Sequence, residues 1–293
     1  MTWITISILS AFFSAARYLY VKKFCASTPA ESLVFSTRVL GAVFLLPGFL
    51  AGTRTISDIP RFCGVLAVTV VLTMAATLIN IRMVQRHAIT RSVPYMSFIP
   101  IFMVPWTWLL YGQVPSPAAF AGILLTCGGA YALNLRPGGN PWQPLRALAS
   151  DRVSLLMLVS SMLIGCTTAF DLTAIRVSSG ATYAFVWTAV SALSIGAAMP
   201  FLHPARIVMR SVVSTHTIVQ AALWAVCFYC QMAAVQTVIT VPSGVTYVKT
   251  LTMVYIVFTV AAGGALFREK GRRRSVAAAA VMVAGAMIVA LYR

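Results

Sequence analysis

Acidic side chains are scarce in this chain of 293 residues. The five that it has are Glu31, Asp58, Asp151, Asp171 and Glu269. Charged residues of both signs make up 9% of the chain and hydrophobic residues 60%, whereas a soluble domain has roughly 25% charged residues. A fold in water cannot cover so much apolar surface with so few charges. The composition therefore excludes a soluble protein and predicts one embedded in lipid.

The sequence also lacks the patterns of common catalytic and metal sites. Its three histidines lie apart, and it has no H-E-x-x-H motif, Ser/His/Asp set or phosphate-binding loop. Cys227 and Cys230 form a C-x-x-C pair, but no second Cys or His pair supplies further metal ligands. We therefore expect no enzyme, no metal site and no cofactor.

Long apolar segments fill almost the whole chain. We place ten of them, at roughly 2–20, 32–51, 63–81, 92–112, 117–135, 153–172, 181–202, 216–237, 245–267 and 275–292. Each has about the 20 residues that a helix needs to cross some 30 Å of hydrocarbon. The first has no basic region before it and no persuasive cleavage site, so we expect it to be retained. The sequence predicts an all-α, polytopic membrane protein with ten transmembrane helices.

The ten segments divide into two sets of five. The longest connection runs from Arg136 to Arg152 and contains PGGNPWQP, whose Pro and Gly content marks a break. We expect a first five-helix repeat at 1–136, a connecting loop at 137–152 and a second five-helix repeat at 153–293. A unit that crosses the bilayer five times ends opposite its start, so the second repeat would be inverted, which is the usual scaffold of secondary transporters.

Basic residues outnumber acidic ones and give a net charge of +17. They lie mainly in short loops, where Lys and Arg set membrane topology and contact anionic lipid. The expected macromolecular surroundings are thus the lipid bilayer and not nucleic acid. Fifteen Lys and Arg fall in odd-numbered loops, against four in even-numbered loops and the termini. For a multi-pass protein of a cell inner membrane, this count predicts cytoplasmic odd loops and both termini outside.

Several motifs resemble the EamA type of the drug/metabolite transporter superfamily, over essentially the whole chain. They are Arg38 within the second segment, Pro94 to Pro100 in the fourth and Tyr111-Gly112-Gln113 at its end, Tyr247-Val-Lys249-Thr250 and Phe267-Arg268-Glu269-Lys270 in the ninth, and Ala284-Gly285-Ala286 in the tenth. Gln113 departs from the Glu usual there, and the ninth segment lacks a core proline. The resemblance implies a ten-helix transporter of metabolites or drugs. It also implies cytoplasmic termini, opposite to the charge count.

Lys249 is the leading candidate for substrate binding. It lies four or five residues into the ninth segment, and a base inside a membrane helix usually faces a cavity or a partner because its insertion costs about 2.5–3.5 kcal/mol at the helix centre. The alternative is a lysine whose ammonium reaches the lipid headgroups. Arg38 binds substrate, pairs with Asp171, or donates to backbone carbonyls at a helix break. For Arg17, close to the end of the first segment, reaching the headgroups is the simpler interpretation.

Uncharged polar residues complete the candidate site. Asn80 and Gln231 are 151 residues apart, at corresponding places in the third and eighth segments; they face a central cavity or hydrogen-bond between helices. Tyr95 and Tyr247 would form aromatic walls, or lie at the membrane interface.

Small residues recur at every fourth position of the fifth segment. They are Ala118, Gly122, Thr126 and Ala130. Such stripes let helix backbones approach closely. We expect a packing face here, either between the halves of the chain or between two copies in a homodimer.

These patterns predict a secondary transporter that moves a small anionic or zwitterionic organic metabolite, such as an amino acid, by alternating access. Basic residues exceed acidic ones within the segments, which disfavours a lipophilic cation as substrate. Two alternatives stay open: a flippase of a lipid-linked or amphiphilic phosphate, and a non-transporting receptor or signalling subunit. With so few acids in the segments, the sequence offers no evident carrier for a coupling proton.

Overall fold

A computed structural model describes residues 2–88, 92–133, 151–202, 214–266 and 272–291 of the chain. These residues are helical almost throughout, and no strand occurs among them. The helices are α1 (Thr2–Phe24), α2 (Ala30–Ala51), α3 (Ile59–Arg86), the 3-10 helix η1 (Val93–Phe98), α5 (Ile99–Tyr111), α6 (Pro117–Leu133), α8 (Arg152–Arg176), α9 (Gly180–Leu202), α11 (Thr215–Thr237), α12 (Gly244–Thr252), α13 (Tyr255–Leu266) and α14 (Arg272–Leu291).

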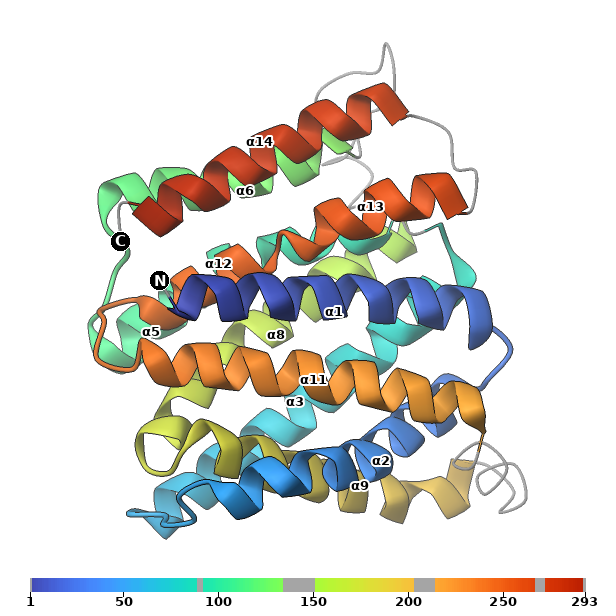
Figure 1. Cartoon of the computed structure of the whole chain (residues 1–293), viewed down its shortest axis with the longest axis vertical. Helices are drawn as coiled ribbons and strands as arrows, with labels where there is room; N and C mark the ends of the chain where they lie inside the picture. The colour runs from blue at the N-terminus through green and yellow to red at the C-terminus, as the bar shows by residue number, and fades with distance from the viewer. Residues whose placement is uncertain (1, 89–91, 134–150, 203–213, 267–271, 292–293) are drawn as a thin grey trace.

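The helices form one bundle whose members run back and forth between two ends (Figure 1). Within the described residues, eight helical stretches are long and apolar enough to cross a membrane. Two further apolar helices, Pro117–Ala132 and Ala277–Leu291, are shorter. Many large apolar side chains, Phe12, Val71 and Leu193 among them, stay exposed on the outside of the bundle. The expectation of an all-helical, multi-pass membrane protein is confirmed.

Polar caps and a glycine set several helix ends. The Asp58 side chain accepts a hydrogen bond from the Arg61 backbone N–H at 3.0 Å, and Asp151 accepts from the N–H groups of Val153 and Ser154. Both carboxylates thus satisfy free donors at the first turn of a helix. Gly112 ends α5 with a φ of 63°, a conformation that favours glycine.

Two segments that we expected to be continuous spans are interrupted. The segment predicted at 92–112 divides into η1 and α5, where Pro94 and Pro100 each remove a backbone donor. The segment predicted at 245–267 divides into α12 and α13 without any proline. There, Thr250 and Thr252 donate to carbonyls four residues back, and such bonds bend helices.

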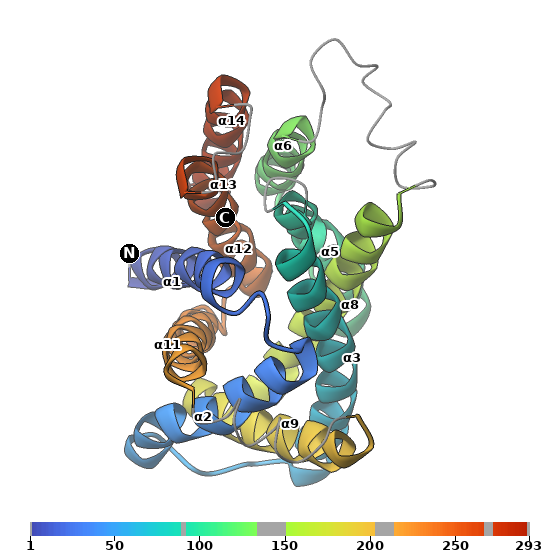
Figure 2. The same cartoon turned by 90° about the vertical axis from the view of Figure 1, so that its right-hand side faces the viewer.

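Helices of the first half pack mainly on helices of the second. The closest pairings are α1 with α11, α3 with α8, α2 with α9 and α6 with α14, and both views show the two halves interleaved (Figures 1 and 2). The expected connecting loop at 137–152 lies almost entirely outside the described residues, so the division into two repeats stays a prediction.

The small residues of α6 pack against α14, which decides between the two expected uses of this stripe. A Cβ atom added to Gly122 would lie 2.7 Å from the Gly285 carbonyl oxygen, and one added to Gly129 would lie 2.9 Å from the Ala278 carbonyl oxygen. Backbones that approach this closely leave no room for a side chain. The stripe therefore joins the two halves of one chain.

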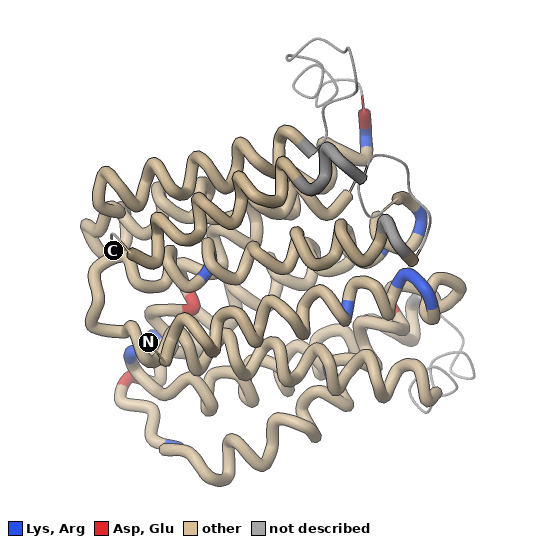
Figure 3. The backbone as a smooth tube through the Cα atoms, turned by 45° about the horizontal axis from the view of Figure 1, so that its top comes forward, with Lys and Arg blue, Asp and Glu red and all other residues tan. Residues whose placement is uncertain are grey.

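Basic segments gather mainly at the end of the bundle opposite the two termini, with a few at the terminal end (Figure 3). At the more basic end, the Lys22 ammonium donates to the carbonyls of Gln85 and His87, which ties α1 to the end of α3. Glu31 forms an ion pair with Arg82. The orientation of these ends in the membrane stays a prediction.

Candidate functional site

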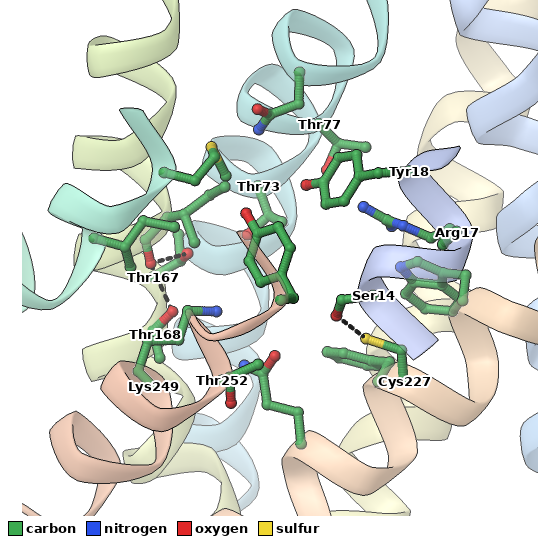
Figure 4. A pocket seen from close by; sticks show the side chains of 18 of the residues that line it. Ser14, Arg17, Tyr18, Thr73, Thr77, Thr167, Thr168, Cys227, Lys249 and Thr252 are labelled. Atoms are coloured by element: carbon green, nitrogen blue, oxygen red, sulfur yellow. Dashed lines mark hydrogen bonds between the residues drawn. The ribbon is translucent and has the colours of Figure 1, made fainter. Parts of the chain in front are cut away.

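One cavity with a volume of about 140 Å³ lies inside the bundle. Helices α1, α2, α3 and α5 of the first half and α8, α9, α11, α12 and α13 of the second all contribute to its wall. Figure 4 shows Arg17 and Ser14 on one side, facing Thr168 and Lys249 on the other. The wall is mixed in character, with aromatic rings, threonine hydroxyls and four charged side chains.

Lys249 lies on this wall. Its side chain projects from α12 into the cavity (Figure 4), and the residue is 8% exposed. No hydrogen bond or ion pair joins its ammonium to any residue in the part of the chain that the structure describes. A buried ammonium without a direct partner is the kind of group that a substrate anion can satisfy.

Arg38 lies against two neighbouring tryptophans. The centre of its guanidinium lies 4.1 Å from the ring centroid of Trp224 and 4.8 Å from that of Trp187, and such cation–π contacts contribute about 2 kcal/mol when desolvated. Its Nη2 lies 3.5 Å from Thr77 Oγ1, while Nε and Nη1 have no hydrogen-bond partner. The rings therefore position a planar fork of donors of which two stay free.

Arg17 belongs to the same wall, which the sequence did not indicate. Its guanidinium lies 4.6 Å above the Tyr18 ring, and its Nε is buried without a hydrogen-bond partner. The expectation that it reaches the headgroups was wrong for a simple reason. Helix α1 runs to Phe24 and not to residue 20, so Arg17 lies about two turns from the helix end.

Asn80 and Gln231 both line the cavity. Asn80 also bonds across helices, since its amide nitrogen donates to Ser160 Oγ at 2.6 Å and to the Ala76 carbonyl at 3.0 Å. Its Oδ1 has no partner. Both of the alternatives considered for Asn80 therefore hold at once, and its carbonyl oxygen is left as a free acceptor at the wall.

Tyr95 and Tyr247, in contrast, do not line the cavity. The Tyr95 hydroxyl donates to Ser154 Oγ at 2.8 Å, and the Tyr247 hydroxyl accepts from the Ser116 N–H at 3.4 Å. Tyr247 is two residues from Lys249, which places the two side chains on nearly opposite faces of one helix. The expectation that these two tyrosines form the aromatic wall is corrected.

Other aromatic residues take that place. Tyr18 and Tyr255 stack with ring centroids 5.4 Å apart, and Trp224 stacks on Phe228 at 4.9 Å. All four line the cavity. Their sequence positions carry no distinguishing signal, because aromatic residues are equally common at membrane interfaces.

Asp171 supplies the single carboxylate among the described residues of the wall. It accepts a hydrogen bond from the Tyr183 hydroxyl and lies within electrostatic range of Lys249. The expected pairing of Asp171 with Arg38 is absent from the described ion pairs, and Arg176, five residues after Asp171, lies over the Tyr111 ring. The cavity thus combines three cations with one acid.

Comparison with known proteins gives a family for the first half of the chain. The model of the EamA-like transporter family matches residues 1–135. The first 135 residues of the chain are therefore similar to EamA-like transporters. The resemblance noted in the sequence is thereby confirmed, and a membrane-transporter fold agrees with the long apolar helices.

The whole chain is matched at the level of fold. A solved structure titled "Crystal structure of protein" aligns with a TM-score of 0.67 and 15% identity, and it covers 100% of this chain and 98% of its own. At this identity the likeness shows the fold alone. No curated protein matches the chain. Among the described residues there is no group of three or more side chains able to hold a metal ion.

Proposed function

We propose that this protein is of the EamA type and is a secondary transporter of a small anionic or zwitterionic organic metabolite, such as an amino acid. The observation that carries the proposal is the charge of the cavity: Arg17, Arg38 and Lys249 face it against one carboxylate. Buried cations whose donors lack partners favour an anionic group in their midst. The tryptophans and threonines beside them suit the organic part of a small metabolite.

We further propose the ten-helix, inverted-repeat arrangement in a cell inner membrane, with the helix contacts as support. If the two repeats correspond in order, α1 corresponds to α8 and α3 to α11. The packing of α1 on α11 and that of α3 on α8 are then the same contact seen twice. The pairs α2 with α9 and α6 with α14 join corresponding helices, as helices beside a two-fold axis do.

Alternating access also has support at the terminal end of the bundle. The Ser243 N–H donates to Gln113 Oε1 at 3.0 Å, and the Gly180 N–H donates to Gln236 Oε1 at 2.8 Å. These bonds join connections that are far apart in the sequence. These few hydrogen bonds need to break when the terminal end of the bundle opens, so the opening costs little free energy.

The first prediction concerns Lys249. In proteoliposomes loaded and assayed with radiolabelled L-alanine, L-glutamate and succinate, Lys249→Ala should lower exchange of whichever probe the wild type carries by at least about tenfold, because a charge-assisted hydrogen bond to the anion is lost. Lys23→Ala is the matched control, since Lys23 is exposed and away from the cavity.

Equal loss in both variants, or none in either, would refute the role of Lys249. The lipid alternative predicts another pattern: no exchange of the soluble probes, and movement of a fluorescent phospholipid phosphate between leaflets that Lys249→Ala abolishes.

A further inference from the structure

Asp171, the acid on the cavity wall, differs in its surroundings from the other described acids. Asp171 lies in α8, facing the cavity, with its carboxylate on the Tyr183 hydroxyl of α9 and within range of Lys249 on α12. The other described acids lie at helix ends: Asp58 and Asp151 are caps, and Glu31 pairs with Arg82. Asp171 is therefore the acid of the described chain that faces the cavity between the helices.

The contacts of Tyr183 accommodate two protonation states of this acid. The Tyr183 hydroxyl lies on Asp171 and also 3.2 Å from Thr69 Oγ1. Thr69 directs its own proton to the Leu66 carbonyl at 3.2 Å, so its oxygen is free to accept. With Asp171 ionised, Tyr183 donates to the carboxylate. With Asp171 protonated, the carboxyl donates to Tyr183, whose proton turns to Thr69, and every group keeps a partner.

The charge of Lys249 links the protonation of Asp171 to the substrate site. With Asp171 ionised, the carboxylate offsets the ammonium across the cavity wall. A proton on Asp171 removes this negative charge and leaves the cations of the cavity uncompensated. An anion entering beside Lys249 then restores the balance. Proton binding and anion binding therefore favour each other, and the pair adds no net charge to the cavity.

We propose that Asp171 is the proton-binding site of the protein, loaded together with an anionic substrate group. The inference rests on the proposed transport function and adds to it a coupling ion. The carrier would move one proton in the direction of the anion, as a symporter. The proton enters and leaves at the Asp171 carboxyl oxygen, and no bond of the substrate changes.

Other ionisable groups surround Asp171, and none replaces it as the acid. Tyr183 of α9 and Lys249 of α12 are the nearest. Tyr111 of α5 lies close to Arg61 of α3 and to Arg176 of α8 itself. Towards the opposite end of α8, Tyr95 of η1 donates to Ser154. All of these groups are tyrosines or bases, so Asp171 is the one carboxyl group in this set.

An infrared titration tests the proton site without any substrate. The purified wild-type protein should show the C=O stretch of a protonated carboxyl group that disappears as pH rises within about pH 4 to 9, and Asp171→Asn should lack this band. Absence of the titrating band in the wild type, or its persistence in Asp171→Asn, would overturn the proposal.

Two further variants test the hydrogen-bond arrangement, and they should act in opposite directions. Tyr183→Phe removes the donor to the ionised form, so the midpoint of the band should rise by about one pH unit. Thr69→Val removes the acceptor needed in the protonated form, so the midpoint should fall by about half a pH unit. Thr188→Val is the control, because its buried hydroxyl bonds the Ala184 carbonyl away from Asp171.

Transport then separates coupling from binding. In proteoliposomes, an acidic exterior should drive the wild type to accumulate whichever of L-alanine, L-glutamate or succinate it exchanges. Asp171→Asn should lose this accumulation, and any exchange that it retains should not change with pH. Accumulation or pH-dependent exchange in Asp171→Asn would overturn the proposal. A titrating band in a protein that exchanges none of the three probes would refute the proposed substrate class and leave the proton site standing.

Discussion

Arg38 owes its position to aromatic rings and not to an acid. Trp187 and Trp224 lie against the guanidinium, and Arg tolerates this setting because it is planar and weakly hydrated. A lysine there would keep the charge and lose the planar fork of donors. The pair of tryptophans therefore favours arginine at this position, and its unpartnered Nε and Nη1 donors favour an anion.

The second prediction follows from that geometry. Arg38→Lys should raise the half-saturating concentration of an exchanged anion about tenfold, because lysine lacks the planar set of donors and 1.4 kcal/mol corresponds to a factor of ten. Concentration-dependent exchange measures this change. Arg54→Lys is the control, since Arg54 is exposed and bonds the Leu50 carbonyl. An unchanged half-saturating concentration in Arg38→Lys would remove Arg38 from the binding site.

At the scale of elements, α6 and α14 pack closely because glycines lie where the two helices cross. A Cβ atom on Gly285 would lie 2.6 Å from the Gly122 carbonyl oxygen. Each of the two helices makes most of its contacts with the other, so their contact contributes much of what keeps them in the bundle. The stripe of small residues was visible in the sequence, whereas its partner helix was not.

The third prediction is that Gly285→Ala destabilises the protein by about 1–3 kcal/mol, because the backbone of α6 cannot move away from an added methyl group without losing its packing. Thermal unfolding in detergent, followed by size-exclusion chromatography, gives the comparison. Gly128→Ala is the matched control: its added Cβ would meet nothing within 4 Å, and alanine favours a helix. Equal stability of the two variants would contradict the packing assigned to α6 and α14.

At the scale of the whole molecule, the two ends of the bundle differ in charge and in how they are tied. The end with the α1–α2 connection carries more of the basic segments (Figure 3), and the terminal end has the bonds of Gln113 and Gln236. The charge count predicts the basic end in the cytoplasm, while the family resemblance predicts the termini there.

The fourth prediction decides between these orientations by thiol labelling. Ser27 and Thr55 are exposed at opposite ends of the bundle, so single Ser27→Cys and Thr55→Cys variants can be labelled with a membrane-impermeant maleimide. The charge count predicts labelling of Thr55→Cys in intact cells and of Ser27→Cys in inverted vesicles. The reverse pattern would favour cytoplasmic termini.

The native thiols interfere little with this experiment. Cys63 is exposed and is replaced by Ala in both variants. Cys25 is close to Ser27 but buried, and burial raises the pKa of its thiol to about 11. At neutral pH the reactive thiolate of Cys25 is scarce, so the signal reports the introduced cysteine.

The sequence alone determined that this protein lies in lipid, that it is helical and about where each apolar helix runs. Composition and hydrophobic length decide these properties, because backbone groups in hydrocarbon must bond within a helix. It also identified Lys249 and Arg38, since charge inside an apolar segment is conspicuous.

The tertiary structure alone decided which polar groups share the cavity. Lys249 and Tyr247 are two residues apart and face opposite ways, and Arg17 reaches the wall because α1 is longer than its apolar core. Asp171 accepts a hydrogen bond from Tyr183 of the next helix, although Arg176 is nearer in the sequence. These outcomes depend on how each helix is rotated against its neighbours, and packing sets that rotation.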